Sequence, residues 1–114
     1  MFIKMDKYSN LLEKYKKVFI ISKENCPLCD NLKTLFDTIE VEYDTYKYEE
    51  TQEEIDNEYP FKTYMKDQTG GKMFPFCYIN GKYVGGYQQV HQNLLMGKLK
   101  EQLNSIGLDY EEDF

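Results

Sequence analysis

The sequence contains no tryptophan, alanine or arginine, and it has only three cysteines, three prolines and one histidine in 114 residues. An odd and small number of cysteines argues against a disulfide-stapled scaffold and for redox or metal chemistry. No apolar run approaches the length of a membrane span, and charged residues come too early for a signal peptide. We therefore expect a soluble, cytoplasmic protein with no membrane partner.

Positive charge is also scarce, because 14 lysines face 20 acidic residues and give a formal net charge of −6. Nine of the acids lie between Glu40 and Glu58, where Lys47 is the single cation, and four more lie in residues 109–114. Since the sequence has no basic stripe, nucleic-acid binding is not expected. We expect the segment 109–114 to be a frayed, solvated end and the acidic block to be a solvated surface.

One stretch carries the chemistry, the C-x-x-C motif Cys26-Pro27-Leu28-Cys29. The apolar run before it, Val18–Ile21, predicts a short strand that is buried on both faces. From Leu28 onward the apolar residues recur with helical spacing, so the two cysteines are expected to open a helix. Pro27 suits the first helical position, because that residue needs no N–H and the proline ring already holds the required φ.

This placement predicts different roles for the two cysteines. Cys26 falls at about the N-cap, where the unpaired N–H groups of the first turn and the helix dipole both favour a thiolate. Lys23 is close enough in sequence to add a positive charge. Cys29 lies one turn further on, within disulfide reach and on the side of the helix that continues to Leu32. We expect Cys26 to be an exposed attacking thiol and Cys29 a protected resolving thiol.

The rest of the chain predicts a single α/β domain over residues 1–114. A parallel βαβ unit is followed by an antiparallel hairpin with its turn at Asn80-Gly81. The last helix begins near Gln88 and is interrupted at Gly97. The other expected elements are helix 6–17, strand 18–21, helix from 28, strand 41–48, helix 51–66 interrupted or ended near Pro60, turn 67–71, and strands 73–79 and 83–84. Their order predicts a four-stranded mixed sheet with helices on its faces.

Several of these motifs, in this order, resemble the glutaredoxins, a family with the thioredoxin-like fold. The resemblance runs from about Val18 to Leu103. It rests on Ser22-Lys23 before Cys-Pro-Leu-Cys, on Thr69-Gly70 before Met73-Phe74-Pro75, and on Tyr78-Ile79-Asn80-Gly81-Lys82 leading into Gly85-Gly86. It implies a thioredoxin-like three-layer sandwich in which helices cover both faces of the sheet, and a monomer.

The resemblance also implies a glutathione site. The Phe74–Pro75 bond is expected to be cis, with the Phe74 backbone facing Cys26 and pairing with the backbone of glutathione. Lys23 and Lys72 match positions where glutaredoxins meet a glutathione carboxylate. The remaining matches are the N–H groups that follow Gly86, at Tyr87 and Gln88, which hold the γ-glutamyl end in the family.

Two residues depart from the family pattern. At position 28 this chain has leucine where the family usually has tyrosine. Close after the glycine pair it has Gln88, where the family usually has aspartate. Without that aspartate the glutathione amino group loses a partner, so glutathione binds more weakly or the electron donor differs. Thioredoxins normally carry a tryptophan before the first cysteine, and its absence here favours a glutaredoxin.

The implied activity is that of a glutathione-dependent thiol-disulfide oxidoreductase acting on disulfide-bearing or glutathionylated proteins. Cys26 attacks a disulfide sulfur, and the mixed disulfide is released by Cys29 or by an outside thiol. Glutathione is the expected co-substrate, and no metal is expected. One alternative is a thioredoxin-like dithiol shuttle that does not use glutathione. Another is an iron–sulfur carrier in which two subunits share a cluster through Cys26 and glutathione, which Pro27 makes the less favoured.

Other residues have simpler interpretations. A structural metal site would have to combine Cys26 and Cys29 with Cys77 and His91, which are far apart in the sequence and form no second motif. We expect Cys77 to be a small core hydrophobe and His91 to be a surface or packing residue. Ordinary surface lysines at 23 and 72, and an edge-strand proline at 75, are the corresponding alternatives for the glutathione contacts.

Overall fold

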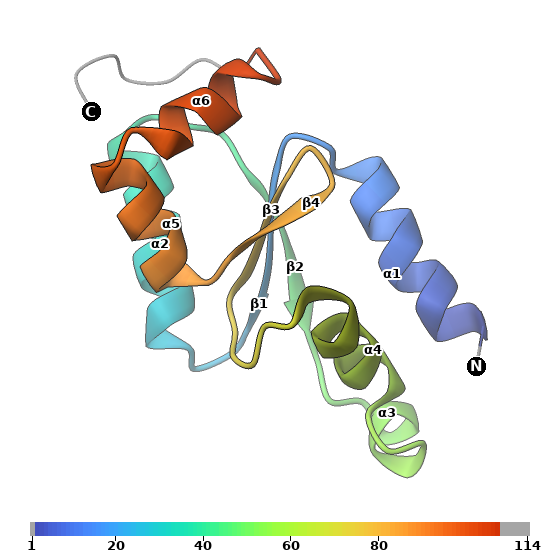
Figure 1. The fold of residues 1–114 in the computed structure, drawn as a ribbon. Coiled ribbons are helices and arrows are strands. Elements are labelled where there is room, and N and C mark those ends of the chain that lie inside the picture. The colour runs from blue at the N-terminus through green and yellow to red at the C-terminus, as the bar shows by residue number, and fades with distance from the viewer. Residues whose placement is uncertain (1, 108–114) are drawn as a thin grey trace.

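The computed structural model describes residues 2–107, so the predicted tail at 109–114 lies outside the described residues. No helix in that range is both long enough and apolar enough to cross a bilayer. Figure 1 shows the elements in chain order. They are α1 (Phe2–Lys14), β1 (Val18–Lys23), α2 (Pro27–Thr38), β2 (Asp44–Tyr48), α3 (Gln52–Asp56), α4 (Pro60–Thr69), β3 (Phe76–Ile79), β4 (Lys82–Gly85), α5 (Tyr87–Leu95) and α6 (Lys98–Asn104).

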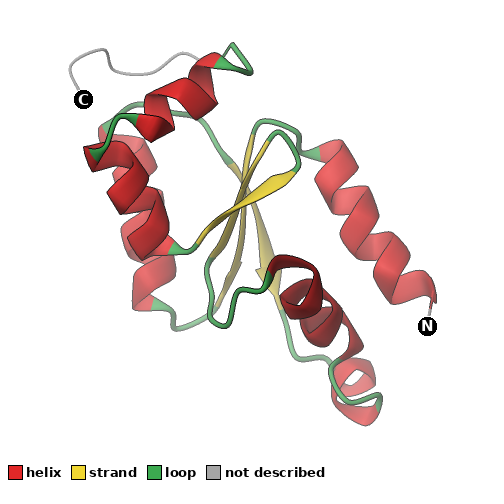
Figure 2. Ribbon diagram, viewed as in Figure 1, coloured by secondary structure: helices red, strands yellow, loops and turns green. Residues whose placement is uncertain are grey.

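The strands form one four-stranded mixed sheet in the order β2-β1-β3-β4 (Figure 2). Strand β1 pairs parallel with β2 and antiparallel with β3, and β3 pairs antiparallel with β4. Helices α1 and α4 lie on one face of the sheet, whereas α2, α5 and α6 lie on the other (Figure 1). The predicted three-layer, thioredoxin-like architecture is therefore confirmed.

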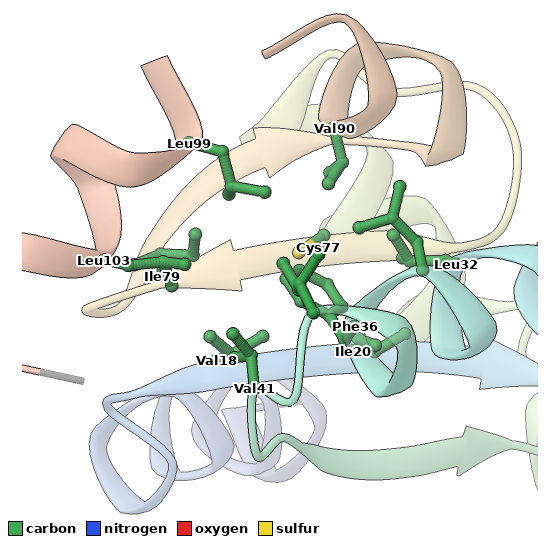
Figure 3. Close-up of a cluster of buried hydrophobic side chains, with 12 residues drawn as sticks. Val18, Ile20, Leu32, Phe36, Val41, Cys77, Ile79, Val90, Leu99 and Leu103 are labelled. Atoms are coloured by element: carbon green, nitrogen blue, oxygen red, sulfur yellow. The ribbon is translucent and has the colours of Figure 1, made fainter. Parts of the chain in front are cut away.

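The sheet is buried on both faces, and its strands divide their side chains between two cores. Val18 and Ile20 of β1 point to the α2, α5 and α6 side, together with Cys77 and Ile79 of β3. We call this the aliphatic core, and Figure 3 shows how its side chains interdigitate. Its other members are Leu32, Leu35, Phe36, Ile39, Val41, Val90, Leu99 and Leu103.

The alternate residues of the same strands point to the α1 and α4 side, since successive side chains of a strand face opposite ways. We call this the aromatic core. It holds both cysteines of the motif, and ring contacts run through it from Tyr8 on α1 to Phe74 beside the motif. Its buried members are Tyr8, Phe19, Ile21, Cys26, Cys29, Tyr48, Phe61, Met65, Phe74, Phe76 and Tyr78.

Several local predictions are confirmed. The predicted strand at Val18–Ile21 is fully buried. Asn80 and Gly81 have φ of 57° and 74°, the positive values that a tight two-residue hairpin turn requires. Gly97, with φ 78°, separates α5 from α6.

The predicted bounds of the first helix are wrong. Helix α1 spans Phe2–Lys14 and not residues 6–17. Nothing in residues 2–5 breaks a helix, so α1 begins before residue 6. It ends earlier because the chain has to turn into the sheet, where the Lys17 carbonyl accepts a hydrogen bond from the Asn80 N–H at 3.0 Å.

Two strand starts also differ from the prediction. Strand β2 begins at Asp44 and not at Val41, because the Val41 N–H donates to the Phe36 carbonyl at the end of α2 (2.9 Å) and not to β1. The strand expected over 73–79 is confined to Phe76–Ile79, after the Phe74–Pro75 bond.

The segment 51–71 differs most from its prediction. The expected helix is two helices, and Pro60 occupies the first position of α4. Asp67 and Thr69 are helical and not part of a turn, because the αL residue that ends α4 is Gly70. Phe61 and Met65 are buried in the aromatic core, so α4 is a core helix, whereas a many-acid helix over 51–66 is expected to be solvated.

Candidate active site

The two cysteines of the motif lie where β1 gives way to α2, and they form a disulfide with a Cα–Cα distance of 5.2 Å. Cys26 is the N-cap of α2, and its sulfur accepts a hydrogen bond from the Cys29 N–H (3.2 Å). Pro27 occupies the first turn, as predicted. In the reduced protein these N–H groups and the helix dipole face the Cys26 sulfur, which favours its thiolate form.

The two sulfurs differ in accessibility in the predicted order. Cys26 is 9% exposed and Cys29 is 1% exposed, so only Cys26 reaches the surface, and it does so at the edge of a depression. The expectation of a freely exposed Cys26 is too strong for this oxidised form. An incoming disulfide meets Cys26 first, and Cys29 lies behind it.

Two adjoining depressions surround Cys26. The first, of about 360 Å³, is lined by Lys23, Leu28, Lys72 and Phe74 as well as by Cys26 itself. The second, of about 390 Å³, shares Leu28, Lys72 and Phe74 with the first. It continues to the start of α5, where Gly86, Tyr87 and Gln88 line it. Every predicted glutathione-binding residue except Pro75 therefore lines this continuous groove.

Pro75 does not line the groove, but it lies beside two residues that do, Phe74 and Gly86. The Phe74–Pro75 peptide bond is cis, as predicted, and Pro75 is buried. A side chain at Gly86 would come within 3.3 Å of the Pro75 carbonyl oxygen, so the glycine allows the two loops to approach closely. The Phe74 ring packs on Tyr48 and Phe76, and Lys23 Nζ lies 5.4 Å from its centroid.

The far end of the groove is the N-terminus of α5. Gly86 is the N-cap of this helix, and no side chain caps the N–H groups of its first turn. Unpaired N–H groups at a helix start attract carboxylates, because they donate hydrogen bonds at the positive end of the helix dipole. Gln88 is exposed there and carries no charge of its own.

Two of the lining residues that the sequence does not predict are lysines. Lys62 and Lys66 of α4 line the first depression, although they lie far from the motif in sequence. The Lys62 ammonium group pairs with Glu50 at 3.3 Å and lies 4.5 Å from the Tyr59 ring centroid. Their spacing of one helical turn places both on one side of α4, but the sequence gives no sign of what that side faces.

A buried carboxylate holds α4 in place beside the site. Glu54, only 2% exposed, accepts hydrogen bonds from the backbone N–H groups of Phe61 (3.2 Å) and Lys62 (3.0 Å). The Tyr48 hydroxyl also donates to Glu54, and burial together with this carboxylate raises the pKa of Tyr48. Glu54 thus satisfies the N-terminus of α4 at the positive end of its dipole. The prediction of a solvated acidic block is therefore wrong for Glu54.

The third cysteine and the histidine lie elsewhere. Cys77 is fully buried in the aliphatic core, and burial raises the pKa of its thiol to about 12. His91 is exposed and stacks on the ring of Tyr87. Both predictions for these residues are confirmed. Within residues 2–107 no three His, Cys, Asp or Glu side chains gather in a way that would hold a metal ion.

Comparisons with known proteins agree with this site. The family model for Glutaredoxin matches residues 18–84. Glutaredoxin-C8 of Oryza sativa subsp. japonica is 30% identical over 96 residues, which cover 84% of this chain and 67% of that protein. A glutaredoxin of Ricinus communis is 30% identical over 90 residues, covering 79% of this chain and 84% of the relative.

Solved structures give the same result. The crystal structure of a buckwheat glutaredoxin–glutathione complex superposes with a TM-score of 0.78 at 26% identity, covering 92% of this chain and 91% of that one. The oxidised glutaredoxin 2 of Chlamydomonas reinhardtii superposes with a TM-score of 0.71 at 27% identity, covering 91% and 96%. The chain therefore belongs to the glutaredoxin family, as a thiol-disulfide oxidoreductase with a Cys26–Cys29 pair of the dithiol type.

Proposed function

We propose that this oxidoreductase uses glutathione as its electron donor and reduces protein disulfides and glutathione mixed disulfides. The observation that carries the proposal is the groove, because it joins Cys26 to the uncapped N-terminus of α5. Glutathione has a thiol between two carboxylate ends. A tripeptide lying in the groove would bring one carboxylate to Lys23 and Lys72 and the other to the N–H groups of Tyr87 and Gln88.

The proposed chemistry is two thiol–disulfide exchanges. The Cys26 thiolate attacks the glutathione sulfur of a mixed disulfide, the S–S bond breaks, and the protein substrate leaves as a thiolate. A second glutathione thiolate then attacks the Cys26-bound sulfur, which releases glutathione disulfide and restores the Cys26 thiolate. For a protein disulfide, Cys26 attacks one protein sulfur and the other leaves as a thiolate. Cys29 then attacks the Cys26 sulfur, the remaining protein sulfur leaves as a thiolate, and two glutathione molecules reduce the Cys26–Cys29 disulfide that forms.

Each group around Cys26 has a definite part in this scheme. The Cys29 N–H and the start of α2 stabilise the Cys26 thiolate both as nucleophile and as leaving group. Cys29, at 1% exposed, is protected from outside disulfides but lies within reach of Cys26. We propose that the enzyme works as a monomer in the cytoplasm, where a glutathione pool would keep the pair reduced.

The test is turnover of a small glutathione mixed disulfide, with glutathione and glutathione reductase supplying electrons. We expect the parent to be active, Cys26→Ser to be inactive, and Cys29→Ser to remain active, since glutathione itself resolves the Cys26 mixed disulfide. An inactive parent whose dithiol still oxidises and reduces reversibly would contradict glutathione dependence. That result would favour a protein dithiol as the electron donor.

Gln88 offers a sharper test of where glutathione binds. An aspartate at this position would place a carboxylate beside the amino group of glutathione, at a helix start that tolerates negative charge. We expect Gln88→Asp to lower the KM for glutathione severalfold, with little change in kcat. Gln52→Asp is the matched control, because Gln52 is a glutamine at the start of α3 that lines neither depression, and an equal effect of the two variants would contradict the assignment.

A further inference from the structure

Lysine supplies every charged side chain that lines the depression beside Cys26. The four lysines come from three segments, namely the end of β1 (Lys23), α4 (Lys62 and Lys66) and the loop before the cis bond (Lys72). The chain as a whole carries a net charge of −6. The depression beside Cys26 is therefore positively charged, whereas the whole molecule has a net negative charge.

These four lysines are not equally engaged. Lys62 is paired with Glu50, and Lys23 lies over the Phe74 ring. Lys66 and Lys72 form no ion pair with any side chain in residues 7–107. Lys72 has a partner in the glutathione proposed above. Lys66 is left without one, although it is half-buried at the last turn of α4.

Of the two depressions that adjoin the cluster, one is lined by acidic side chains and the other is not. Glu24, Glu49 and Glu50 line a depression towards β2, together with Lys23 and Lys62. In the opposite direction, towards α5, the groove includes Lys72 and no acidic residue. Met73, which is 64% exposed, projects from the same loop as Lys72. Lys66, Lys72 and Met73 thus form a cationic and apolar rim of the depression beside Cys26, and Lys72 and Met73 continue into the acid-free groove.

We propose that this rim docks the polypeptide part of a glutathionylated substrate, and that it selects segments with acidic side chains beside the modified cysteine. The inference rests on the proposed function. A carboxylate on the substrate would meet the Lys66 ammonium group, and apolar neighbours would cover Met73. Complementary charges of this kind raise the rate of encounter and fix orientation more than they raise affinity.

The test compares two glutathionylated peptides that differ only in having Asp and Glu, or Lys, on either side of the cysteine. We expect the parent to have about a tenfold higher kcat/KM for the acidic peptide at low ionic strength. The preference should fall towards unity near 1 M salt, where the screening length is about 3 Å. Lys66→Gln should reduce the preference about threefold, and Lys66→Glu should reduce it further.

Lys98→Gln is the matched control, since Lys98 is an exposed lysine at the start of α6, outside the groove. It should keep the full preference of the parent. Equal kcat/KM for the two peptides with the parent, or a preference that neither salt nor Lys66→Gln alters, would overturn the docking rim. If the small glutathione mixed disulfide is turned over while the peptides are not distinguished, only the rim is wrong. If the parent turns over none of the three, the proposed function fails with it.

Discussion

The two cores on either side of the sheet differ in composition and in what they position. The aliphatic core under α2, α5 and α6 consists mainly of Val, Leu and Ile side chains, and its one sulfur is the inert Cys77. The aromatic core under α1 and α4 contains both site cysteines and, among the described residues, six ring contacts between buried tyrosine or phenylalanine side chains. It also contains a buried carboxylate that joins Tyr48 to α4.

This difference has a physical basis. Aliphatic side chains contribute to the fold through packing alone, so this core tolerates substitutions that conserve its volume. Tyrosine adds a hydroxyl that needs a partner when it is buried, and each such bond fixes the relative position of two elements. Tyr8 bonds to Tyr78, and Tyr48 bonds to Glu54. The lesson is that one core supplies stability and the other also aligns the site.

The largest effect is expected in the aliphatic core, from Leu99→Ala. Leu99 is fully buried on α6 and lines neither depression of the groove, and its truncation leaves a cavity. We expect the free energy of unfolding to fall by about 2–5 kcal/mol. Urea unfolding measures the loss, and the turnover per folded molecule should be kept. A large fall in turnover of the folded protein would show that the aliphatic core also aligns the site.

A smaller loss is expected in the aromatic core from Tyr48→Phe, which removes one donor from the Glu54 carboxylate. Leaving a buried acceptor with fewer partners costs about 1–3 kcal/mol. Tyr46→Phe is the matched control, because Tyr46 lies on the same strand and contacts the same Phe61 ring. Of the two variants, only Tyr48→Phe should also raise the KM for glutathione, since the ring that packs on Phe74 loses the hydrogen bond that holds it. Equal urea midpoints for the two variants would contradict this role of Glu54.

Alkaline pH should destabilise the aromatic core in particular. Burial raises the pKa of Tyr8, Tyr48 and Tyr78, so these hydroxyls keep their protons in the fold at a pH where the unfolded chain loses them. Their contribution to the free energy of unfolding is complete below about pH 9. It falls as the pH rises further, by about 1.4 kcal/mol per pH unit for each group. Urea midpoints from pH 7 to 11 measure it, and Tyr48→Phe should have the shallower slope.

The smallest effect is expected from Cys77→Ala, which removes about one methylene-sized group from the aliphatic core and costs about 1 kcal/mol. With its pKa raised to about 12, the Cys77 thiol should resist alkylation in the folded, reduced protein while Cys26 reacts. Mass spectrometry after iodoacetamide treatment, with and without urea, checks both points. Labelling of Cys77 in the native protein would show that the aliphatic core opens.

The sequence by itself determined the local features of this protein. Proline after Cys26 started α2, Asn80-Gly81 closed the hairpin, and Gly97 divided the last helix, because each of these acts through its own backbone preferences. The family resemblance added the cis bond before Pro75, which periodicity cannot reveal. The cysteine pair and its order of burial also followed from spacing along one helix.

Tertiary structure alone decided which distant residues meet. Lys62 and Lys66 reach Cys26 because α4 packs across the aromatic core, and that packing depends on Phe61 and Met65 contacting strands far away in sequence. Glu54 is a structural carboxylate because Pro60 starts a new helix whose N–H groups need an acceptor. Sequence patterns report neighbours within a few residues, whereas charge and burial at this site arise from segments that only the fold brings together.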